Sequence, residues 1–248
     1  MCGRFTLRTP QARLIEQFAV PDFPQLPLRF NIAPSQEIVV VRQHPGGRRR
    51  EAVMARWGLV PTWAKDPNKG NRPINARGET AAEKPMFRTA FRSRRCLVPA
   101  DGYYEWQQSG EGKQPYFIHM RDDGPFALAG LWERWHRGEQ VIQSCTIITT
   151  AANPLTRPIH ERMPVILPPQ VYDVWLDAEF ADVDHLTELL RPYDGDAMQV
   201  YPVGRGVNRP AYDAPGCIVE ADIESDEAVE SVETVEAEGG DVAPGRLF

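Results

Sequence analysis

The sequence predicts an α+β protein with a mostly antiparallel, barrel-like β-sheet core and a few flanking helices. Short apolar runs with strand character outnumber the helical patterns, and turn signals such as Asp101-Gly102 and Asp123-Gly124 separate them. Strands and helices do not alternate at the spacing of βαβ units, which argues against a parallel sheet. At 248 residues the chain can bury one substantial core or two small ones.

Nine runs predict strands, because each is rich in β-branched, aromatic or other apolar residues and is short. They are Ile38–Arg42, Ala52–Trp57, Cys96–Pro99, Tyr103–Gln107, Tyr116–His119, Phe126–Trp132, Ile142–Thr149, Val165–Leu167 and Gln199–Val203. Helices are fewer. At the first, Thr9 serves as the N-cap and Pro10 takes the first helical position, before the apolar stripe of Leu14, Ile15 and Phe18. The other predicted helices are Ala81–Arg95, with some irregularity at Pro85, Val171–Leu176 and Asp184–Leu190.

Charge is unevenly distributed along the chain. Ten acidic residues and Arg246 give residues 220–248 a net charge of −9, so the preceding 219 residues carry +3 of the overall −6. The acidic segment has few large apolar groups, which predicts a disordered tail after a folded domain of residues 2–219. Within that domain, Arg88, Arg92 and Arg95 fall at helical spacing on one predicted face, a pattern that suits a nucleic-acid backbone.

Composition argues against several classes of protein. No apolar run is long enough to span a bilayer and no secretory signal is evident, so we expect a cytoplasmic protein that binds no membrane, nucleoid-associated if prokaryotic. The four cysteines and five histidines lack metal-ligand spacing, so we expect neither a metal nor another cofactor. Cys96 and Cys145 lie in apolar runs, and we expect both to be buried and free of disulfides.

Residue 2 is a cysteine, and removal of Met1 would give Cys2 a free α-amine beside its thiol. The ordinary pKa values of these two groups, roughly 8 and 8.5, leave both partly available near neutral pH. Such an aminothiol condenses with an aldehyde through nitrogen and closes a thiazolidine ring through sulfur. From Met1-Cys2 alone, the alternative that Cys2 is an ordinary small residue stays open.

Two polar blocks are candidates for phosphate binding and proton transfer. The segment Asn75–Thr80 puts an amide, the Arg77 guanidinium and a carboxylate at the mouth of a predicted helix, which suits either a phosphate or a simple helix cap. The segment His160–Pro164 offers a proton shuttle in His160 and a phosphate ligand in Arg162, or two surface side chains.

A third block combines a carboxylate with aromatic residues. Alternation along the predicted strand puts Tyr103 and Glu105 on one face and Trp106 on the other. Partial burial would tune Glu105 for acid–base catalysis, whereas an exposed strand would leave it solvated. Trp63 and Pro34 lie in loop-like contexts, where rigid apolar side chains can stack on bases or separate strands.

Taken together and in order, the blocks of this sequence resemble the SRAP (SOS response-associated peptidase) family, whose members crosslink to abasic sites in single-stranded DNA. The matching blocks are M-C-G-R-F, F-N-I-A-P, W-G-L-V-P-x-W, I-N-A-R-x-E-T, P-A-D-G-Y-Y-E-W, A-G-L-W and H-E-R-M-P. The resemblance covers the body of the chain and excludes the acidic tail. It implies the SRAP fold and a thiazolidine crosslink that shields the lesion during the DNA damage response. It also implies weak lyase activity. Two routes to removal of Met1 stay open, an aminopeptidase or the protein itself acting by a protease-type hydrolysis.

The resemblance implies a role for each matching residue. Cys2 would be the nucleophile, Asn75 would orient it or the sugar, Glu105 would transfer protons during imine formation, and His160 would assist sugar ring opening and crosslink reversal. The residues implied to contact DNA are Arg4, Pro34, Trp63, Arg77, Trp106, Thr149 and Arg162. The implied partners are single-stranded DNA with abasic sites and junctions between single and double strands, bound by a monomer without a metal.

Two other functions stay open. Class II glutamine amidotransferases also begin Met-Cys-Gly, and in such an N-terminal-nucleophile amidohydrolase the cysteine attacks an amide. Against this reading, no recognisable glutamine-binding block follows in the sequence. The second alternative is a noncatalytic DNA-binding module, in which Cys2 takes no part in any reaction. Only the crosslinking function predicts a stable covalent adduct with abasic DNA.

Overall fold

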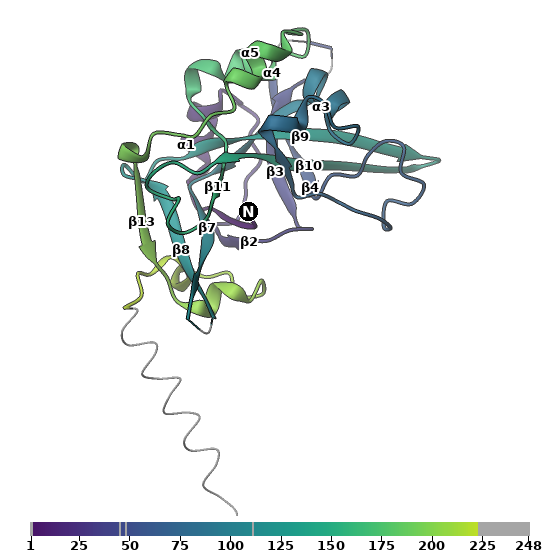
Figure 1. Ribbon diagram of the computed structural model, residues 1–248. Coiled ribbons are helices and arrows are strands. Elements are labelled where there is room, and N and C mark those ends of the chain that lie inside the picture. The colour runs from purple at the N-terminus through teal and green to yellow at the C-terminus, as the bar shows by residue number, and fades with distance from the viewer. Residues whose placement is uncertain (1, 45, 48, 111, 223–248) are drawn as a thin grey trace, which may run out of the picture.

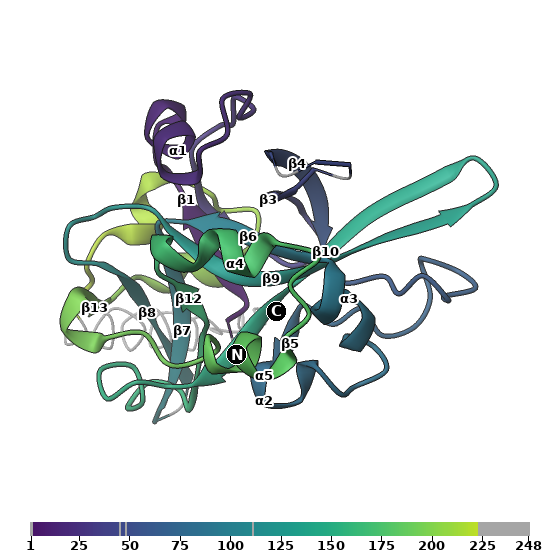
Figure 2. The same cartoon turned by 90° about the horizontal axis from the view of Figure 1, so that it is seen from above.

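The computed structural model describes residues 2–44, 46–47, 49–110 and 112–222. Within them two β-sheets pack against each other, and short helices lie on the outside of the larger sheet (Figures 1 and 2). No helix in these ranges is both long and apolar enough to cross a membrane. The acidic tail predicted for residues 220–248 falls almost wholly outside the described residues.

The larger sheet closes into a barrel. Its strands are β3 (Glu37–Gln43), β4 (Arg50–Trp57), β5 (Asn75–Arg77), β6 (Arg95–Ala100), β9 (Phe126–Arg137), β10 (Gln140–Ala151), β11 (Arg162–Pro164) and β12 (Ile166–Leu167). The pairing order β10-β4-β3-β6-β9 returns to β10 because β9 also pairs with β10. Only the pairings of β10 with β4 and β5 are parallel among the described strands. The predicted barrel-like, mostly antiparallel core is confirmed.

The smaller sheet is antiparallel throughout its described strands, in the order β13-β8-β7-β1-β2. Its strands are β1 (Arg4–Leu7), β2 (Arg29–Ile32), β7 (Gly102–Ser109), β8 (Gly112–Met120) and β13 (Met198–Pro202). All nine predicted strands overlap observed ones. The sequence did not predict β1, β2, β5 and β11, because three or four residues are too few to establish an alternating pattern.

The helices are short. They are α1 (Gln11–Phe18), α2 (Gly78–Ala81), α3 (Arg88–Ser93), α4 (Tyr172–Leu176) and α5 (Val183–Glu188), with 3₁₀ helices at Pro169–Val171, Gly195–Ala197, Arg205–Asn208 and Pro215–Ile218. In α1, Leu14 and Phe18 are buried as predicted. The helix begins one residue later than expected, because the Thr9 hydroxyl donates to Asp101 Oδ2 at 2.8 Å and does not cap it.

The single helix predicted over Ala81–Arg95 is wrong. The chain forms α2, a turn that contains Pro85, and then α3, because proline lacks an amide donor and disfavours helix in the residue before it. Arg95 belongs to β6 and is buried, where its guanidinium donates to the backbone carbonyls of Phe91 and Trp175. The predicted basic face that included Arg95 is therefore absent from α3.

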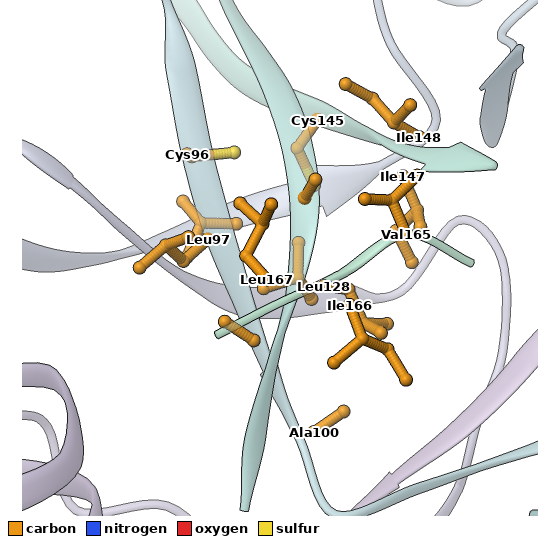
Figure 3. Packing of buried hydrophobic residues seen from close by; sticks show 14 of the residues in the cluster. Cys96, Leu97, Ala100, Leu128, Cys145, Ile147, Ile148, Val165, Ile166 and Leu167 are labelled. Carbon is orange, nitrogen blue, oxygen red and sulfur yellow. The ribbon is translucent and has the colours of Figure 1, made fainter. Parts of the chain in front are cut away.

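Buried aliphatic side chains fill the barrel (Figure 3). Cys96 and Cys145 are fully buried and unbridged among them, as predicted. The Phe5 ring of the smaller sheet meets the Trp57 ring of the barrel edge to face at 5.3 Å. This contact joins the two sheets directly behind the start of β1, so burial of apolar surface fixes where the N-terminal segment lies.

Candidate functional site

Cys2 lies two residues before the start of β1 in the smaller sheet, and it contacts Asn75 of the barrel. Asn75 opens β5 on the barrel and donates from Nδ2 to the Cys2 carbonyl oxygen at 2.8 Å. The amide reaches this position because β5 pairs in parallel with β10, with Asn75 opposite Ile147. The structure thus brings together two predicted residues that are 73 positions apart.

The Cys2 thiol is fully buried. Its sulfur lies 3.8 Å from the Arg4 carbonyl oxygen, a weak hydrogen bond within the same turn of chain. Burial raises the pKa of the thiol well above its ordinary value, and the nearby Glu105 carboxylate raises it further. The sulfur is therefore a neutral thiol near pH 7, and any reaction through it requires a group that accepts its proton.

Glu105 lies on β7, which pairs with β1 through Arg4 and Tyr104. Only 2% of its surface is exposed, so the solvated alternative for Glu105 is wrong. Burial raises the pKa of this carboxyl group from 4.5 to about 7. The acid and carboxylate forms are therefore both populated near neutral pH, which suits a group that both accepts and returns a proton.

Tyr103 is a member of the site to which the sequence gave no role. It is fully buried on the same face of β7 as Glu105. Burial raises the pKa of its phenol most strongly, and the nearby ionisable groups of Cys2 and Glu105 raise it further. The phenol therefore stays neutral. Its two-residue spacing from Glu105 was the available signal in the sequence.

His160 is half-buried in the segment that leads into β11. Its Nδ1 accepts a hydrogen bond from the Arg162 backbone amide at 2.9 Å. That bond assigns the proton of the neutral ring to Nε2, and burial lowers the pKa of the imidazole. His160 is thus a neutral imidazole with a donor at Nε2 near pH 7.

Arg162 forms a bidentate ion pair with Glu79, a residue to which the sequence assigned no separate role. Its Nη1 and Nη2 atoms lie 2.6 and 2.9 Å from the two carboxylate oxygens, and Nη2 also donates to the Thr149 carbonyl oxygen at 2.7 Å. The Arg162 hydrogen bond lowers the pKa of Glu79. Arg77, at the end of β5, is exposed and contributes to the same shift. The Glu79 carboxylate therefore uses the hydrogen-bond donors of Arg162, the guanidinium that was predicted to bind a phosphate.

Arg4 and Trp106 lie next to each other on the paired strands β1 and β7. The Arg4 guanidinium carbon lies 6.0 Å from the centroid of the Trp106 ring, and burial lowers the pKa of Arg4. The Trp106 indole donates to Asn208 Oδ1 at 2.7 Å, which connects the site to the C-terminal part of the domain. Arg4 and Trp106 thus form a cationic and aromatic pair on the face of β7 opposite Glu105.

Pro34 and Trp63 belong to two loops at the same end of β4. Pro34 is half-buried in a turn whose next residue, Ser35, donates its amide to the Trp57 carbonyl oxygen at 2.8 Å. Trp63 lies in the loop that follows Trp57 and is 66% exposed. The structure therefore brings both predicted wedge residues to the same end of β4, Pro34 in the turn before β3 and Trp63 in the segment that leads into Asn75.

The site combines a nucleophilic thiol, a carboxylic acid with a pKa near neutrality, a neutral imidazole and arginine side chains. In the described ranges no cluster of three His, Cys, Asp or Glu residues is arranged to hold a metal ion. The set of groups suits condensation with an electrophilic carbon and binding of an anion beside it.

Comparison with known proteins gives consistent matches. A family model described as SOS response associated peptidase (SRAP) matches residues 1–210. The chain is 43% identical over 223 residues to the abasic site processing protein YoqW of Bacillus subtilis, covering 88% of this chain and 99% of YoqW. It is 34% identical over 204 residues to the abasic site processing protein HMCES of Gallus gallus, covering 72% of this chain and 60% of HMCES. A crystal structure of a Bacteroides thetaiotaomicron protein, 25% identical, matches with a TM-score of 0.78 over 89% of this chain and all of that one.

Proposed function

This chain belongs to the SRAP family, and on that basis we propose that it recognises abasic sites in DNA and crosslinks to them through Cys2. Support comes from the names of its relatives, which are abasic site processing proteins. A ring-opened abasic deoxyribose carries an aldehyde, the electrophile that an aminothiol captures. The product shields the lesion while the DNA damage response proceeds.

The observation that carries the proposal is the hydrogen bond from Asn75 to the Cys2 carbonyl oxygen, next to the buried Glu105. A structural cysteine at position 2 would need no amide from another sheet and no carboxyl group with a pKa of about 7 beside it. Buried acids with perturbed pKa values concentrate at functional sites, since their burial costs stability. This environment supports a reactive Cys2.

The chemistry balances without a cofactor. Removal of Met1 by hydrolysis frees the Cys2 α-amine, which attacks the aldehyde carbon and forms a carbinolamine. Loss of one water gives an imine. The thiol then adds across the carbon–nitrogen double bond, so that the sulfur joins carbon and its proton ends on nitrogen. The net reaction joins protein and DNA with loss of one water.

Glu105 and His160 assist the proton transfers in this proposal. Glu105 accepts a proton from the Cys2 α-ammonium before the free amine attacks, and it returns a proton to the departing hydroxyl, a cycle that a pKa of about 7 supports. The Nε2–H of His160 donates a hydrogen bond to the sugar ring oxygen as the ring opens, and the proton that leaves the C1 hydroxyl ends on that ring oxygen. The hydrogen bond that Nδ1 accepts from Arg162 supports this tautomer.

We assign DNA contacts to the groups around this centre. Arg4 and Arg77 would bind phosphates that flank the lesion, and Trp106 would stack on a base. Arg162 would join them when its bond to Glu79 opens, with the Thr149 carbonyl oxygen holding the guanidinium in place. Single strands and junctions are the preferred substrates, because a stacked abasic nucleotide must be extruded to reach a buried Cys2.

Two further activities follow from the same intermediates. The imine permits β-elimination, so a weak lyase activity precedes ring closure. We also assign removal of Met1 to the protein itself. Cys2 is fully buried in the folded domain, so an external peptidase would have to act before folding. An N-terminal mass measurement of a refolded chain that still carries Met1 tests this, because self-processing alone then releases methionine.

Intact mass spectrometry after mixing with an abasic oligonucleotide tests the crosslink. The wild type is expected to gain the oligonucleotide mass less one water. Cys2→Ala is expected to form no stable adduct, while its α-amine still allows an imine that borohydride traps. A stable, untrapped adduct in Cys2→Ala would contradict the thiazolidine, and the absence of any adduct in the wild type would contradict the function.

A further inference from the structure

The loop of residues 58–74, here called the Trp63 loop, presents an unusual surface. Its Trp63 side chain is 66% exposed, although a tryptophan ring has much apolar area to bury. The segment of residues 61–73 contains Lys65, Lys69 and Arg72 against a single acid, Asp66. An exposed indole among cations suits a nucleic-acid base plane and its phosphates. The loop leads directly into Asn75, the residue that hydrogen-bonds to the Cys2 carbonyl oxygen.

A β-hairpin runs beside this loop. Strands β9 and β10 each have twelve residues, but pairing with β6 ends at Leu131 and pairing with β4 reaches only Ser144. Residues 132–143, here called the outer hairpin, therefore extend beyond the barrel, and the Trp63 loop follows them on one side (Figures 1 and 2). The base of the outer hairpin still contacts the barrel, since the Arg42 guanidinium of β3 lies 4.0 Å from the centroid of the Trp132 ring.

Three side chains of the hairpin strands hydrogen-bond to the backbone of the loop. Ser144 Oγ accepts from the Val60 amide at 2.8 Å. The Trp135 indole donates to the Ala64 carbonyl oxygen at 2.8 Å, and Arg137 Nη1 donates to the Lys65 carbonyl oxygen at 2.9 Å. Two of these bonds fix the backbone immediately after Trp63. Trp135 is only 2% exposed, so the loop covers it completely.

These bonds lie on one face of the hairpin only. Trp135 and Arg137 alternate with Arg134 and His136, which point to the opposite face and are exposed. The loop is therefore held on the hairpin by two specific hydrogen-bond donors, the Trp135 indole and the Arg137 guanidinium. Fixing a loop before binding lowers the entropic cost of stacking a ligand on it.

We infer that the outer hairpin is a brace for the Trp63 loop, and that Trp135 and Arg137 are positioning residues for DNA junctions. The occupant is the terminal base pair of a duplex beside the lesion, stacked on the Trp63 indole with its phosphates near Lys65 and Lys69. A duplex end is a rigid plane, so it benefits from a rigid loop more than a flexible single strand does. This inference rests on the proposed function.

The test compares crosslinking of two abasic substrates, a single strand and the same strand with a duplex that ends next to the lesion. Trp135→Phe keeps the ring packing but loses the donor to Ala64, and Arg137→Gln weakens the second bond. Each is expected to raise the concentration for half-maximal crosslinking of the junction about fivefold, the effect of one lost hydrogen bond. The maximal rate and the behaviour on the single strand should stay unchanged.

Matched controls come from the opposite face of the same strand. Trp132→Phe and Arg134→Gln make the same chemical changes without touching the loop, and both are expected to keep the junction preference of the wild type. Trp63→Ala should abolish that preference. As a second readout, trypsin should cleave after Lys65 and Lys69 faster in Trp135→Phe than in Trp132→Phe, since the unbraced loop is more mobile.

The outcomes separate the inference from the function it rests on. If Trp135→Phe and Arg137→Gln keep the junction preference while Trp63→Ala loses it, the inference that the outer hairpin braces the Trp63 loop is wrong. Equal losses on both substrates would show a merely structural role and overturn the inference. If Trp63→Ala leaves the preference intact, the loop is not the duplex platform. A wild type without any adduct on either substrate would instead refute the crosslinking function.

Discussion

At the scale of single residues, burial determines the chemistry of this site. Cys2 and Glu105 are both almost completely buried, and burial raises the pKa of each group. The thiol stays protonated, whereas the pKa of the carboxyl group moves to about 7 and into the working range of a catalyst. The charge state of Glu105 therefore changes between mildly acidic and mildly basic solution.

A first prediction concerns Glu105 and the pH dependence of stability. Its pKa of about 7 in the folded chain exceeds the ordinary value of 4.5, so the native state binds this proton more tightly between these pH values. The free energy of unfolding therefore falls as pH rises through this window, by on the order of 3 kcal/mol in total. Glu105→Gln has no such charge to bury and should lose this dependence.

Chemical denaturation at a series of pH values measures the effect. Above about pH 8 the Glu105→Gln variant should be more stable than the wild type, and below about pH 4 the two should be equal. The variant should also crosslink more slowly than the wild type at neutral pH, because an amide neither accepts nor returns the proton. Equal stabilities across the whole range would mean that Glu105 is not buried as a carboxylate.

A second prediction concerns the carboxylate that pairs with Arg162. Glu79 uses both terminal nitrogens of the guanidinium, so it competes with phosphate for the same donors. We expect Glu79→Gln to tighten noncovalent binding of single-stranded DNA and to steepen its logarithmic salt dependence by about one unit, the effect of one additional phosphate contact. Fluorescence anisotropy with labelled DNA at several salt concentrations measures both quantities.

Glu83→Gln is the matched control for this prediction, because Glu83 is exposed just beyond α2 and the charge change is the same. It should have a smaller effect than Glu79→Gln, and Arg162→Ala should cancel the gain. If Glu79→Gln weakens binding, the carboxylate positions Arg162 and does not compete with DNA. Equal effects of the two glutamate variants would leave only net charge as the cause.

At the scale of elements, short strands from two sheets hold the site together. β1 continues the chain after Cys2, β7 carries Glu105 and β5 carries Asn75. β1 pairs with β7, β7 also pairs with β8, and β5 pairs with β10 of the barrel. The close approach of β7 to β8 begins at Gly102. A Cβ atom at this position would lie 2.2 Å from Phe117 Cζ and 2.3 Å from Phe117 Cε2. β7 can therefore lie this close to the Phe117 ring only with glycine at position 102.

A third prediction follows for Gly102. We expect Gly102→Ala to destabilise the protein by about 1–3 kcal/mol, because the buried Phe117 ring must move or β7 must shift. A shift of β7 would also displace Glu105 and slow crosslinking. Gly204→Ala is the control, since its φ is −61° and no heavy atom lies within 4 Å of the added carbon. Thermal unfolding of both variants measures the difference, and equal midpoints would contradict the tight approach.

At the scale of the whole molecule, the C-terminal part of the domain hydrogen-bonds to β2, the strand at one end of the smaller sheet. Asn31 donates its side-chain amide to the carbonyl oxygens of Val207, Arg209 and Tyr212. Pairing continues slightly past the predicted boundary at residue 219, since Glu220 bridges to Val203 and the Ala221 amide donates to the Pro202 carbonyl oxygen at 3.0 Å. The segment after Asp222 holds eight acids and one arginine, a net charge of −7.

A fourth prediction concerns this acidic segment. We propose that it competes with DNA for the basic face, so truncation after Asp222 should leave folding and crosslinking intact. Noncovalent DNA binding should be equal or tighter at low salt, and the difference should vanish at high salt because salt screens the competition. Circular dichroism, intact mass and anisotropy measure the three properties. Loss of folding in the truncated chain would place the segment within the domain.

The sequence by itself determined the class of fold, the positions of nine strands and the blocks that contain the reactive residues. Those features depend on neighbours along the chain, because alternation and turn residues are local properties. Local pattern failed for the segment 81–95, where Pro85 and the burial of Arg95 outweighed helical spacing. It also failed for β1, β2, β5 and β11, which are defined by pairing with strands from other parts of the chain and not by an alternating pattern of their own.

Only the tertiary structure decided how the reactive residues act. The burial of Glu105, the hydrogen bond from Asn75 to Cys2 and the pairing of Glu79 with Arg162 have no trace in local pattern. The two pairs join residues that are 73 and 83 positions apart, and Trp135 meets the Trp63 loop across 71. Desolvation and charge pairing depend on which distant segments come together, and the closed barrel determines that.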